Sequence, residues 1–597
     1  METTTKQALK GGEFIIKSTD PMDIFIPEEW NEEQLMIAQT CRDFVEQEIN
    51  PRLDEIDSQK DPNLVPSLLE KAGELGILGI SIPEEYGGFG KDFVTGMLTT
   101  EVCGAAHAFA VALSAHTGIG TLPILYYGNE EQKAKYIPKL SSGEWKAAYC
   151  LTEPSSGSDA NSGKSKATLS PDGTHYILNG QKMWITNGGF ADVYTVFAKI
   201  DNDENLSAFI VERTYEGVTT NAEEKKMGIK GSSTVQVFFN NVKVPVENLL
   251  SDRQNGFKIA LNILNIGRIK LGGAAIGGSK AAITTSIKYA NEREQFGRPI
   301  SKYGAIRHKI AEQIIQTWVS EAATYRCSKN IEEAIIDLEQ GGLSHEKALL
   351  KGVEQYAAEA AMLKVAASES LDFVVDEAVQ IFGGMGYSEE SPVARAYRDS
   401  RINRIFEGTN EINRMLTVDM LLKKAMKGEL DLMGPAMKVA GELMEIPEFS
   451  EPDGTPLAAE EKAIQGFKKA LLMVAGSAAQ KLMMNLAKEQ EVLMNISDIA
   501  IQTYLAESAY LRAKKIALIK GEQEAEAAIA IARTFIYDAA DKIHKHAKDA
   551  LNAFAEGDEH RMMLMGLRRF TKTEPVNTKE LRRLVAQKAI EANQYCY

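Results

Sequence analysis

Glu407 has the setting in this chain that best fits an acid–base catalyst. It stands in the segment RIFEGTNEINR, 404–414, after Ile405 and Phe406 and before a glycine and a threonine that can start a helix. A carboxylate among apolar residues has a raised pKa because burial disfavours its charged form, and such a group can act as a general base near neutral pH. An exposed glutamate at a helix start would give the same pattern, so this segment alone leaves both interpretations open.

Three further segments carry residue types that suit a planar, phosphorylated cofactor, although each has a plain structural alternative. The loop CLTEPSSGSDANS, 150–162, offers hydroxyls and backbone N–H groups to a polar ligand, or is simply a Ser/Gly-rich turn. In KMWITNGG, 182–189, Trp184 and Thr186 share one side of a strand and can flank a flavin or belong to a core. The run QIFGGMGYSEESPVARAYRD, 380–399, has three glycines that permit close approach of a phosphate or another helix, or merely end a helix.

Other cofactor and catalytic motifs are absent from the sequence. The segment GAAIGGSK, 273–280, places Ser before Lys, the reverse of a P-loop, and no GxGxxG follows a strand. No GxSxG occurs, which removes the usual support for an α/β-hydrolase. His544 and His546, with His560 nearby, lie in a lysine-rich helical stretch typical of a solvated face, so we expect no metal.

Charge and composition exclude further classes. The 597 residues hold 67 Lys and Arg against 83 Asp and Glu, a net charge of −16, which argues against a nucleic-acid partner. The five cysteines are widely spaced and odd in number, which favours reduced thiols over a disulfide framework. No export signal is visible, and the apolar runs are interrupted before the length of a membrane span, so we expect a cytoplasmic protein.

A scaffold must position the candidate catalytic and cofactor-binding residues. The pattern of apolar and turn-forming residues changes three times along the chain. Residues 1–30 precede a mainly helical block at 31–144, and short β-branched and aromatic runs with DG and NG turns predict antiparallel sheet over 145–248. Helical patterns return over 249–428, where the small residues of 267–291 predict a helix packed close to its neighbours. A proline-containing stretch then opens a helical extension over 429–597. The sequence therefore predicts an α+β protein that is mainly α.

The four segments, in this order and on these backgrounds, resemble the acyl-CoA dehydrogenase family of flavoproteins. They are similar to its flavin loop, its WIT/WIS strand, its QxxGGxG signature and its EGT catalytic loop. The helical extension, together with ALNILNIGRI and NEREQFG, resembles the very-long-chain branch most closely. The resemblance implies a helical N-terminal domain, a middle β-domain, a four-helix-bundle domain that holds FAD, and an extra helical domain.

The resemblance also implies roles for residues by position. Those implied to line the isoalloxazine are Tyr149, Leu151, Thr152, Ser158, Trp184 and Thr186, and those implied to hold the pyrophosphate and adenosine across a subunit interface are Arg293, Phe296, Gln380, Gly383 and Gly384, with Thr409 and Glu411 completing the site. Ser158, Asn265, Arg268 and Gly408 fall at positions that contact acyl-CoA in relatives, which often carry Asp at the position of Asn265.

The implied reaction is the α,β-dehydrogenation of acyl-CoA to trans-2-enoyl-CoA in fatty-acid β-oxidation. Glu407 would take the α-proton, the β-hydrogen would pass to flavin N5 as hydride, and an electron-transfer flavoprotein would accept the electrons. Some relatives carry the base immediately before the equivalent of Arg268, where this chain has Gly267, so one base is available. The alternatives are an acyl-CoA oxidase on the same fold and a largely non-catalytic scaffold relative.

Assembly, chain length and membrane contact rest on weaker signals. Because the cofactor crosses subunits in the family, we expect a homo-oligomer, with a dimer favoured. The extension and the small residues of 105–114, AAHAFAVALS, favour long acyl chains, although these residues could instead let two helices pack closely. The basic segment 561–588 predicts a solvated or dimer-supporting face, with peripheral membrane contact as the alternative.

Overall fold

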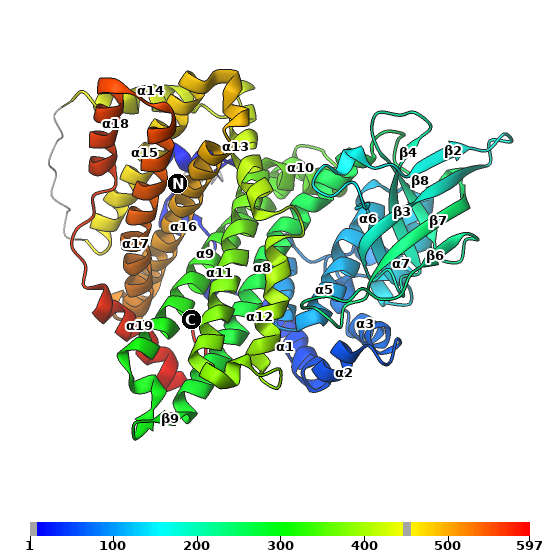
Figure 1. Ribbon diagram of the computed structural model, residues 1–597, viewed down its shortest axis with the longest axis horizontal. Helices are drawn as coiled ribbons and strands as arrows, with labels where there is room; N and C mark the ends of the chain where they lie inside the picture. Colours follow the sequence, from blue (N-terminus) through cyan, green and yellow to red (C-terminus); the bar gives the residue numbers. More distant parts are fainter. Residues whose placement is uncertain (1–8, 446–454) are drawn as a thin grey trace.

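The computed structural model describes residues 9–445 and 455–597, and it confirms the mainly helical α+β class. The helical extension lies on one side, a long helical bundle occupies the centre, and the sheet lies on the other side (Figure 1). The first block is helical, as expected: α1 (Glu32–Phe44), α2 (Leu53–Ser58), α3 (Leu64–Glu74), α4 (Phe93–Cys103), α5 (His107–Ser114), α6 (Leu122–Tyr127) and α7 (Glu130–Ser142). Asn31 and Asn129 close reciprocal caps with Gln34 and Gln132, which fixes where α1 and α7 begin.

The sheet block contains eight strands in the order β6-β7-β3-β2-β4-β5-β8, with β1 also paired to β4. The strands are β1 (Ala147–Cys150), β2 (Lys166–Leu169), β3 (His175–Thr186), β4 (Val193–Ile200), β5 (Ser207–Glu212), β6 (Val218–Thr220), β7 (Thr234–Pro245) and β8 (Leu249–Leu250). Most pairs are antiparallel, as predicted, but β4 pairs in parallel with both β1 and β2. Nearly every residue of β4 is buried, so β4 is an interior strand. A period-two pattern cannot show whether the neighbouring strands run parallel or antiparallel to it.

A register shift between Lys182 and Ile185 interrupts β3 next to the expected site. Trp184 lies in this shift with a φ of 60° and is 55% exposed. Trp184 and Thr186 were predicted to share a face because side chains alternate regularly along a strand. The bulge interrupts this alternation between the two residues. Their relative orientation is therefore set by the bulge and not by their spacing.

The central bundle consists of α8 (Gly256–Glu292), α9 (Gly304–Gln340), α10 (His345–Gln355), α11 (Ala357–Phe382), α12 (Pro392–Ser400) and α13 (Asn410–Met426), with a hairpin of β9 (Glu294–Gln295) and β10 (Arg298–Pro299) after α8. Helix α8 contains the whole predicted segment 267–291 and lies in the block where helical patterns were expected to return. A Cβ at Gly277 would overlap the carbonyl of Glu101 in α4, and one at Gly104 would overlap the carbonyl of Ala274. The predicted close packing of this helix is confirmed.

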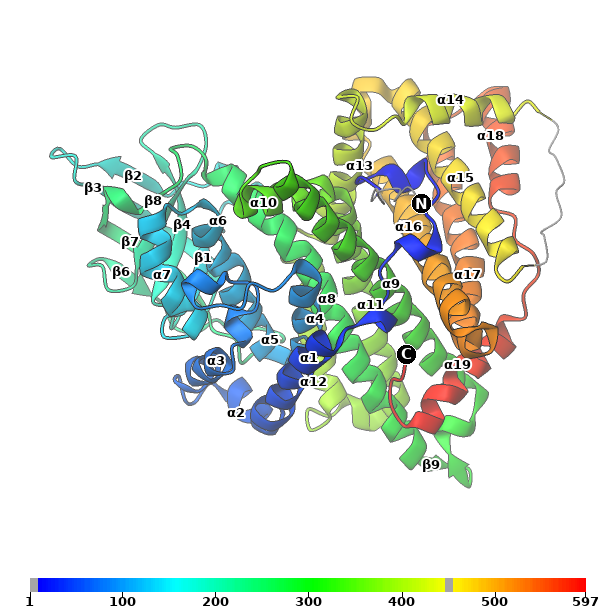
Figure 2. The ribbon, with the colours of Figure 1, turned by 180° about the vertical axis from the view of Figure 1, so that it is seen from behind.

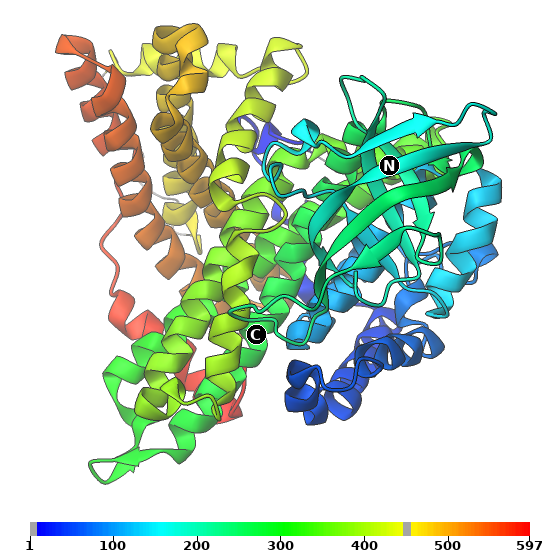
Figure 3. The same ribbon diagram turned by 45° about the vertical axis from the view of Figure 1, so that its right-hand side comes forward.

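The extension is formed by α14 (Met433–Glu442), α15 (Ala458–Leu482), α16 (Gln490–Lys520), α17 (Glu522–Phe554), α18 (Gly557–Phe570) and α19 (Thr578–Ala592). It shares one continuous core with the bundle, since Trp318 of α9 and Phe467 of α15 belong to the same buried cluster. Ion pairs cross the contact, with 2.9 Å between Arg326 and Glu507. The sheet block and the extension thus pack on different sides of the bundle (Figure 3).

The N-terminal segment 9–30 runs along the junction between the bundle and the extension (Figure 2). Phe14 packs edge-on against Tyr504 with 4.8 Å between ring centroids. Glu28 accepts from Arg512 at 2.8 Å, and that arginine also pairs with Glu321 of α9 at 2.6 Å. Of the predicted extension 1–30, residues 1–8 lie outside the described residues.

Three helical stretches are apolar and long enough, by length and composition alone, to cross a membrane: His107–Tyr127, Gly256–Glu292 and Ala458–Lys488. The expectation that every apolar run is too short was therefore wrong on this measure, because helices rich in Ala and Gly stay apolar over many turns without a run of large side chains. Most of the apolar window is buried against the protein in the first two stretches, and 39% of it in the third.

Candidate active site

Glu407 lies on the loop between η13 (Arg401–Arg404) and α13. Its φ is 58° and that of Gly408 is 82°, so two consecutive residues adopt left-handed backbone. Thr409 caps α13 by accepting from the N–H of Ile412, and the side-chain amide of Asn413 donates to the carbonyls of Gly408 at 2.8 Å and Thr409. Strained backbone of this kind persists only where its surroundings fix it, as these bonds do.

The setting of the Glu407 carboxylate raises its affinity for a proton. Its Oε2 is buried and has no hydrogen-bond partner among the described residues. Burial raises its pKa to about 7, against the opposing charges of Arg268 and Lys364. A Cβ added to Gly267 would lie 2.8 Å from Oε2, so the carboxylate sits directly over this glycine of α8. The predicted base therefore has the buried setting that its flanking residues suggested, with one oxygen free.

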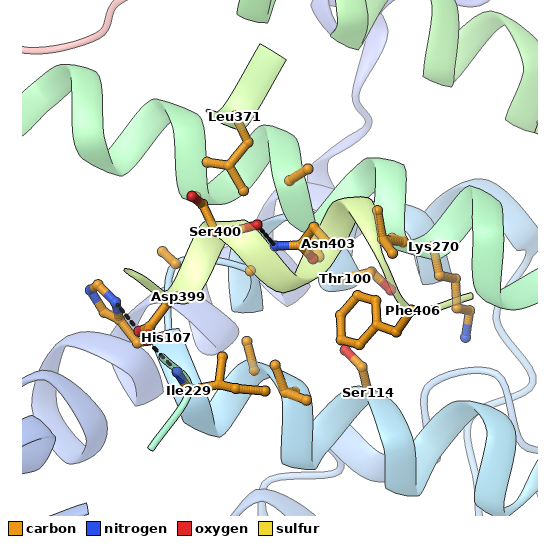
Figure 4. A pocket seen from close by; sticks show the side chains of 18 of the residues that line it. Thr100, His107, Ser114, Ile229, Lys270, Leu371, Asp399, Ser400, Asn403 and Phe406 are labelled. Atoms are coloured by element: carbon orange, nitrogen blue, oxygen red, sulfur yellow. Dashed lines mark hydrogen bonds and ion pairs between the residues drawn. The ribbon is translucent and has the colours of Figure 1, made fainter. Parts of the chain in front are cut away.

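A cavity of about 220 Å³ opens in front of this carboxylate. Glu407 and Phe406 line it together with Thr186 from β3 and Ser114 from α5. Figure 4 shows Phe406 and Ser114 close to Thr100 and Lys270, and, elsewhere in the cavity, His107 bonded to Asp399, which also accepts from the N–H of Ile229. The lining is mainly Ala, Gly, Val, Ile and Leu, which excludes water and suits a hydrocarbon chain.

The predicted substrate residues on α8 lie beside the base. Arg268 is buried, donates to Asn265 Oδ1 at 2.7 Å, and directs Nε towards the Glu407 carbonyl at 3.3 Å. Gly408 accepts at its carbonyl from Lys364 Nζ at 2.7 Å, and Lys364 also donates to Asn410 at 2.8 Å. Asn265, Arg268 and Gly408 are thus gathered around Glu407, whereas Ser158 lies on an exposed loop.

The residues predicted to line the flavin ring come from β1, the loop after it, and β3. Tyr149 is buried, its hydroxyl has no partner among the described residues, and burial together with Glu407 raises its pKa. The Leu151 carbonyl accepts from Lys182 Nζ at 3.1 Å, and the Thr152 carbonyl accepts from the N–H of Met183 at 2.9 Å, so one side-chain bond and one main-chain bond hold this loop against β3. Thr186 alone among the predicted flavin residues lines the cavity with Glu407.

The residues predicted to hold the nucleotide half lie elsewhere. Tyr289 stacks on Phe382 at 3.9 Å, which brings the ends of α8 and α11 together and places near them Arg293, Phe296, Gln380, Gly383 and Gly384. Phe296 is 94% exposed, and Gly383 and Gly384 have open space where a Cβ would be. At 1.5 Å per residue, about 40 Å of α8 separates Gly267 from Arg293. Thr409 and Glu411, by contrast, belong to the loop and first turn next to the base.

Two lysines of this region were not predicted. Lys364 is fully buried, and its pKa is lowered to about 8 by burial. Lys270 lines the cavity, and burial also lowers its pKa to about 8. The sequence signal available for both residues was a lysine on the apolar face of a predicted helix. This pattern alone cannot distinguish a lysine whose amine is buried from one whose long side chain carries the amine to solvent.

Comparisons with known proteins match nearly every part of this architecture. Family models described as the N-terminal, middle and C-terminal domains of acyl-CoA dehydrogenase match residues 31–144, 148–242 and 254–422. A further model, also described as a C-terminal domain of acyl-CoA dehydrogenase, matches residues 466–569 in the extension.

Individual relatives agree. A probable acyl-CoA dehydrogenase of Bacillus subtilis is 46% identical over 98% of both chains, and the very long-chain specific acyl-CoA dehydrogenase of rat mitochondria is 42% identical over 62% of this chain and 55% of its own. The crystal structure of an acyl-CoA dehydrogenase complexed with FAD from Bacillus anthracis superposes with a TM-score of 0.96 at 46% identity, covering 99% of this chain and 100% of that one. The chain belongs to the acyl-CoA dehydrogenase family.

Proposed function

We propose that this protein is an FAD-dependent dehydrogenase that converts acyl-CoA, favouring long chains, to trans-2-enoyl-CoA in fatty-acid β-oxidation. The observation that carries the proposal is the Glu407 carboxylate, which has a pKa of about 7 and a free buried oxygen at the wall of an apolar cavity. A carboxylate of ordinary pKa would be too weak a base for the carbon next to a thioester.

In the proposed reaction Glu407 Oε2 takes the α-proton, and the backbone N–H of the same residue donates to the thioester oxygen as negative charge develops there. Arg268, Lys364 and Asn413 hold the carbonyls of the loop, so the base and the donor keep a fixed relation. The apolar cavity wall excludes water from the proton transfer. FAD, when bound, supplies the redox chemistry by accepting the β-hydrogen as hydride.

The residues present fit FAD. The Thr186 hydroxyl shares the cavity with Glu407, as a donor to the reactive edge of a flavin must, and Trp184 is a largely exposed aromatic on the same strand. Open space at Gly383 and Gly384 leaves room for a phosphate near the main chain. Tyr149, Leu151, Thr152, Ser158, Thr409 and Glu411 complete the proposed set on the flavin side.

The distance along α8 supports a dimeric site. About 40 Å of helix between Gly267 and Arg293 exceeds the reach of one extended FAD molecule. Arg293, Phe296, Gln380, Gly383 and Gly384 are therefore proposed to hold the nucleotide half of the FAD whose flavin lies in the partner subunit. Phe296 is almost fully exposed in the single chain, which is consistent with a surface that a second copy covers.

Chain length is the finer part of the proposal. Ala105, Ala110, Val111 and Ser114, from the predicted small-residue segment, line the cavity, so their size leaves volume in the substrate site. A chain-length series from C4 to C20 tests this. Each buried methylene adds about 0.8 kcal/mol, so kcat/KM should keep rising beyond C8, and an optimum at C4 to C8 would remove the long-chain proposal alone.

The proposed acceptor is an electron-transfer flavoprotein, and the proposed location is the cytoplasm. The basic segment 561–588 favours support of the bundle over membrane contact. Its Arg582 pairs with Glu312 of α9 and with Asp538 of α17, and its Arg569 donates to the carbonyl of Glu442. Fewer positive charges therefore remain for an anionic surface than the sequence suggests.

Anaerobic addition of palmitoyl-CoA to the purified yellow protein tests the assignment. The bound flavin should bleach, and Glu407→Gln should keep FAD and bind substrate but bleach at least ~10³-fold more slowly, since removal of a general base costs 10²–10⁴. Absence of bleaching by any acyl-CoA would overturn the proposal and leave the scaffold alternative. Stoichiometric peroxide in air would instead indicate the acyl-CoA oxidase.

A further inference from the structure

Lys270 is a half-buried lysine of the cavity wall that the proposed reaction does not use. No hydrogen bond, ion pair or ring contact joins its ammonium to another residue within 9–445 and 455–597, although its neighbours on α8 are tightly packed. Burial is the one cause of its lowered pKa, about 8, with no nearby carboxylate to oppose it. A desolvated ammonium without a partner is costly, and the described residues supply no acceptor for it.

The amine stands where two cavities meet. A second cavity of about 500 Å³ lies beside the first one, of about 220 Å³. The residues that line both are Thr100, Ser114, Thr117, Leu122, Ile266 and Lys270. Lys270 is the single charged member of this shared wall, so an acyl chain that runs from Glu407 towards the second cavity would pass along the Lys270 side chain.

The carboxylates around the second cavity already have partners. Glu332 accepts from the N–H of Val94 at 3.0 Å and from Lys329, and Glu339 pairs with His345 at 2.6 Å. Asp92 caps α4 by accepting from Thr95. None of these carboxylates contributes to the pKa shift of Lys270.

The position of Lys270 on α8 determines which carbon of a bound acyl chain its amine could contact. It lies three residues beyond Gly267, the glycine under the Glu407 carboxylate, which is about 4.5 Å along the helix. The extended lysine stem adds several ångströms to this reach, and an extended chain advances about 1.2 Å per bond. A group six to ten carbons along an acyl chain is therefore within range of Nζ.

We propose that Lys270 forms a subsite for a carboxylate at the far end of the acyl chain, so that the enzyme accepts ω-carboxyacyl-CoA thioesters of about six to ten carbons. The inference rests on the proposed function and deepens it by naming a substrate class. A carboxylate is the acceptor that satisfies a desolvated ammonium best, because the bond is charge-assisted. Plain acyl chains gain only dispersion contacts with the lysine stem.

The test compares matched substrates on the holoenzyme. Anaerobic flavin bleaching and kcat/KM with a dye acceptor are measured for octanoyl-, decanoyl- and palmitoyl-CoA and for the mono-CoA thioesters of the C6, C8 and C10 dicarboxylic acids. The variants are Lys270→Met, which keeps the length and removes the charge, and Lys270→Arg, which keeps the charge. Lys258→Met, an exposed lysine of the same helix, is the matched control.

We expect the wild type to turn over the C6, C8 and C10 dicarboxylyl thioesters, and Lys270→Met to lose about tenfold to hundredfold in kcat/KM for them relative to its kcat/KM for decanoyl-CoA. Lys270→Arg should retain much of the preference, and Lys258→Met should change neither class. An equal loss on both classes, or no wild-type turnover of dicarboxylyl thioesters while palmitoyl-CoA bleaches the flavin, would overturn the subsite and leave the dehydrogenase standing. Failure of every thioester to bleach the flavin would instead remove the proposed function.

Discussion

At the residue scale, the proposed chemistry depends on one carboxylate, Glu407, whose charged form is disfavoured. The sequence predicted this setting from Ile405 and Phe406, and the structure adds its cause, burial over Gly267 with no partner for Oε2. The absence of a side chain at Gly267 makes room for the Glu407 carboxylate. A carboxyl group on the helix at this position and one on the loop would compete for the same space.

The raised pKa of Glu407 predicts a pH-dependent cost to stability. Its pKa is about 7 in the fold and near 4.5 in an unfolded chain, so between these values the folded protein binds the extra proton and stability falls as pH rises. Glu407→Gln removes the cost. Thermal unfolding should show the variant more stable than the wild type at pH 8, by up to about 3 kcal/mol, with little gain at pH 4.5. The same gain at both pH values would contradict the linkage.

Lys364 is predicted to act as a positioning and charge-compensating residue. Its ammonium bonds to the Gly408 carbonyl and to Asn410, and its charge lowers the pKa of Glu407. Because the proposed reaction needs the ionised Glu407, Lys364→Met should move the acid limb of kcat/KM to higher pH and lower the rate at pH 6 roughly tenfold.

Lys364→Arg should restore part of the wild-type pH profile, and Lys351→Met, an exposed lysine on α10, serves as the control. A uniform loss of activity at all pH values, with the limb unmoved, would show that Lys364 supports the loop only structurally.

At the element scale, the sequence located the blocks but not the details that aim the side chains. Periodicity predicted a glycine-rich helix over 267–291, but not that this helix continues without a break back to Gly256. The alternation rule failed at Trp184, because the bulge in β3 depends on pairing with β7, a strand about fifty residues away. Lys270 and Lys364 were not predicted as site residues for a similar reason, because the burial of a lysine depends on how the helices of the bundle pack.

The packing of α4 against α8 predicts opposite outcomes for two adjacent glycines. A methyl group at Gly277 would overlap the main chain of Glu101, whereas one at Gly278 would meet Leu371 at an ordinary 3.5 Å. Gly277→Ala should therefore lower the thermal midpoint by several degrees through displacement of α4. Gly278→Ala should be neutral or stabilising, since alanine favours a helix by up to about 1 kcal/mol over glycine. Equal effects of the two changes in calorimetry would contradict this packing.

At the scale of the whole molecule, the extension is built into the enzyme and is not an appended module. The N-terminal segment, α9 and α16 meet at a buried set of charges in which Arg512 joins Glu28 to Glu321. The sequence revealed the extension as a helical block, but it gave no sign that the two ends of the chain would be tied through the central bundle. Such contacts join residues hundreds of positions apart, which no local pattern encodes.

The separation of the two halves of the proposed FAD site leads to a complementation experiment. A Glu407→Gln protomer keeps Arg293 and Gln380 but lacks the base, while an Arg293→Ala/Gln380→Ala protomer keeps Glu407 but offers no nucleotide contacts to its partner. If the site is shared, a mixed dimer contains one intact site: the Glu407 of the second protomer with the Arg293 of the first. Two-tag coexpression should then yield mixed dimers with about half the wild-type activity per dimer, and random mixing about a quarter per subunit. A site contained within one protomer would leave the mixture as inactive as the two parents, because neither chain then carries both halves, and this result would refute the shared site while leaving Glu407 as the base.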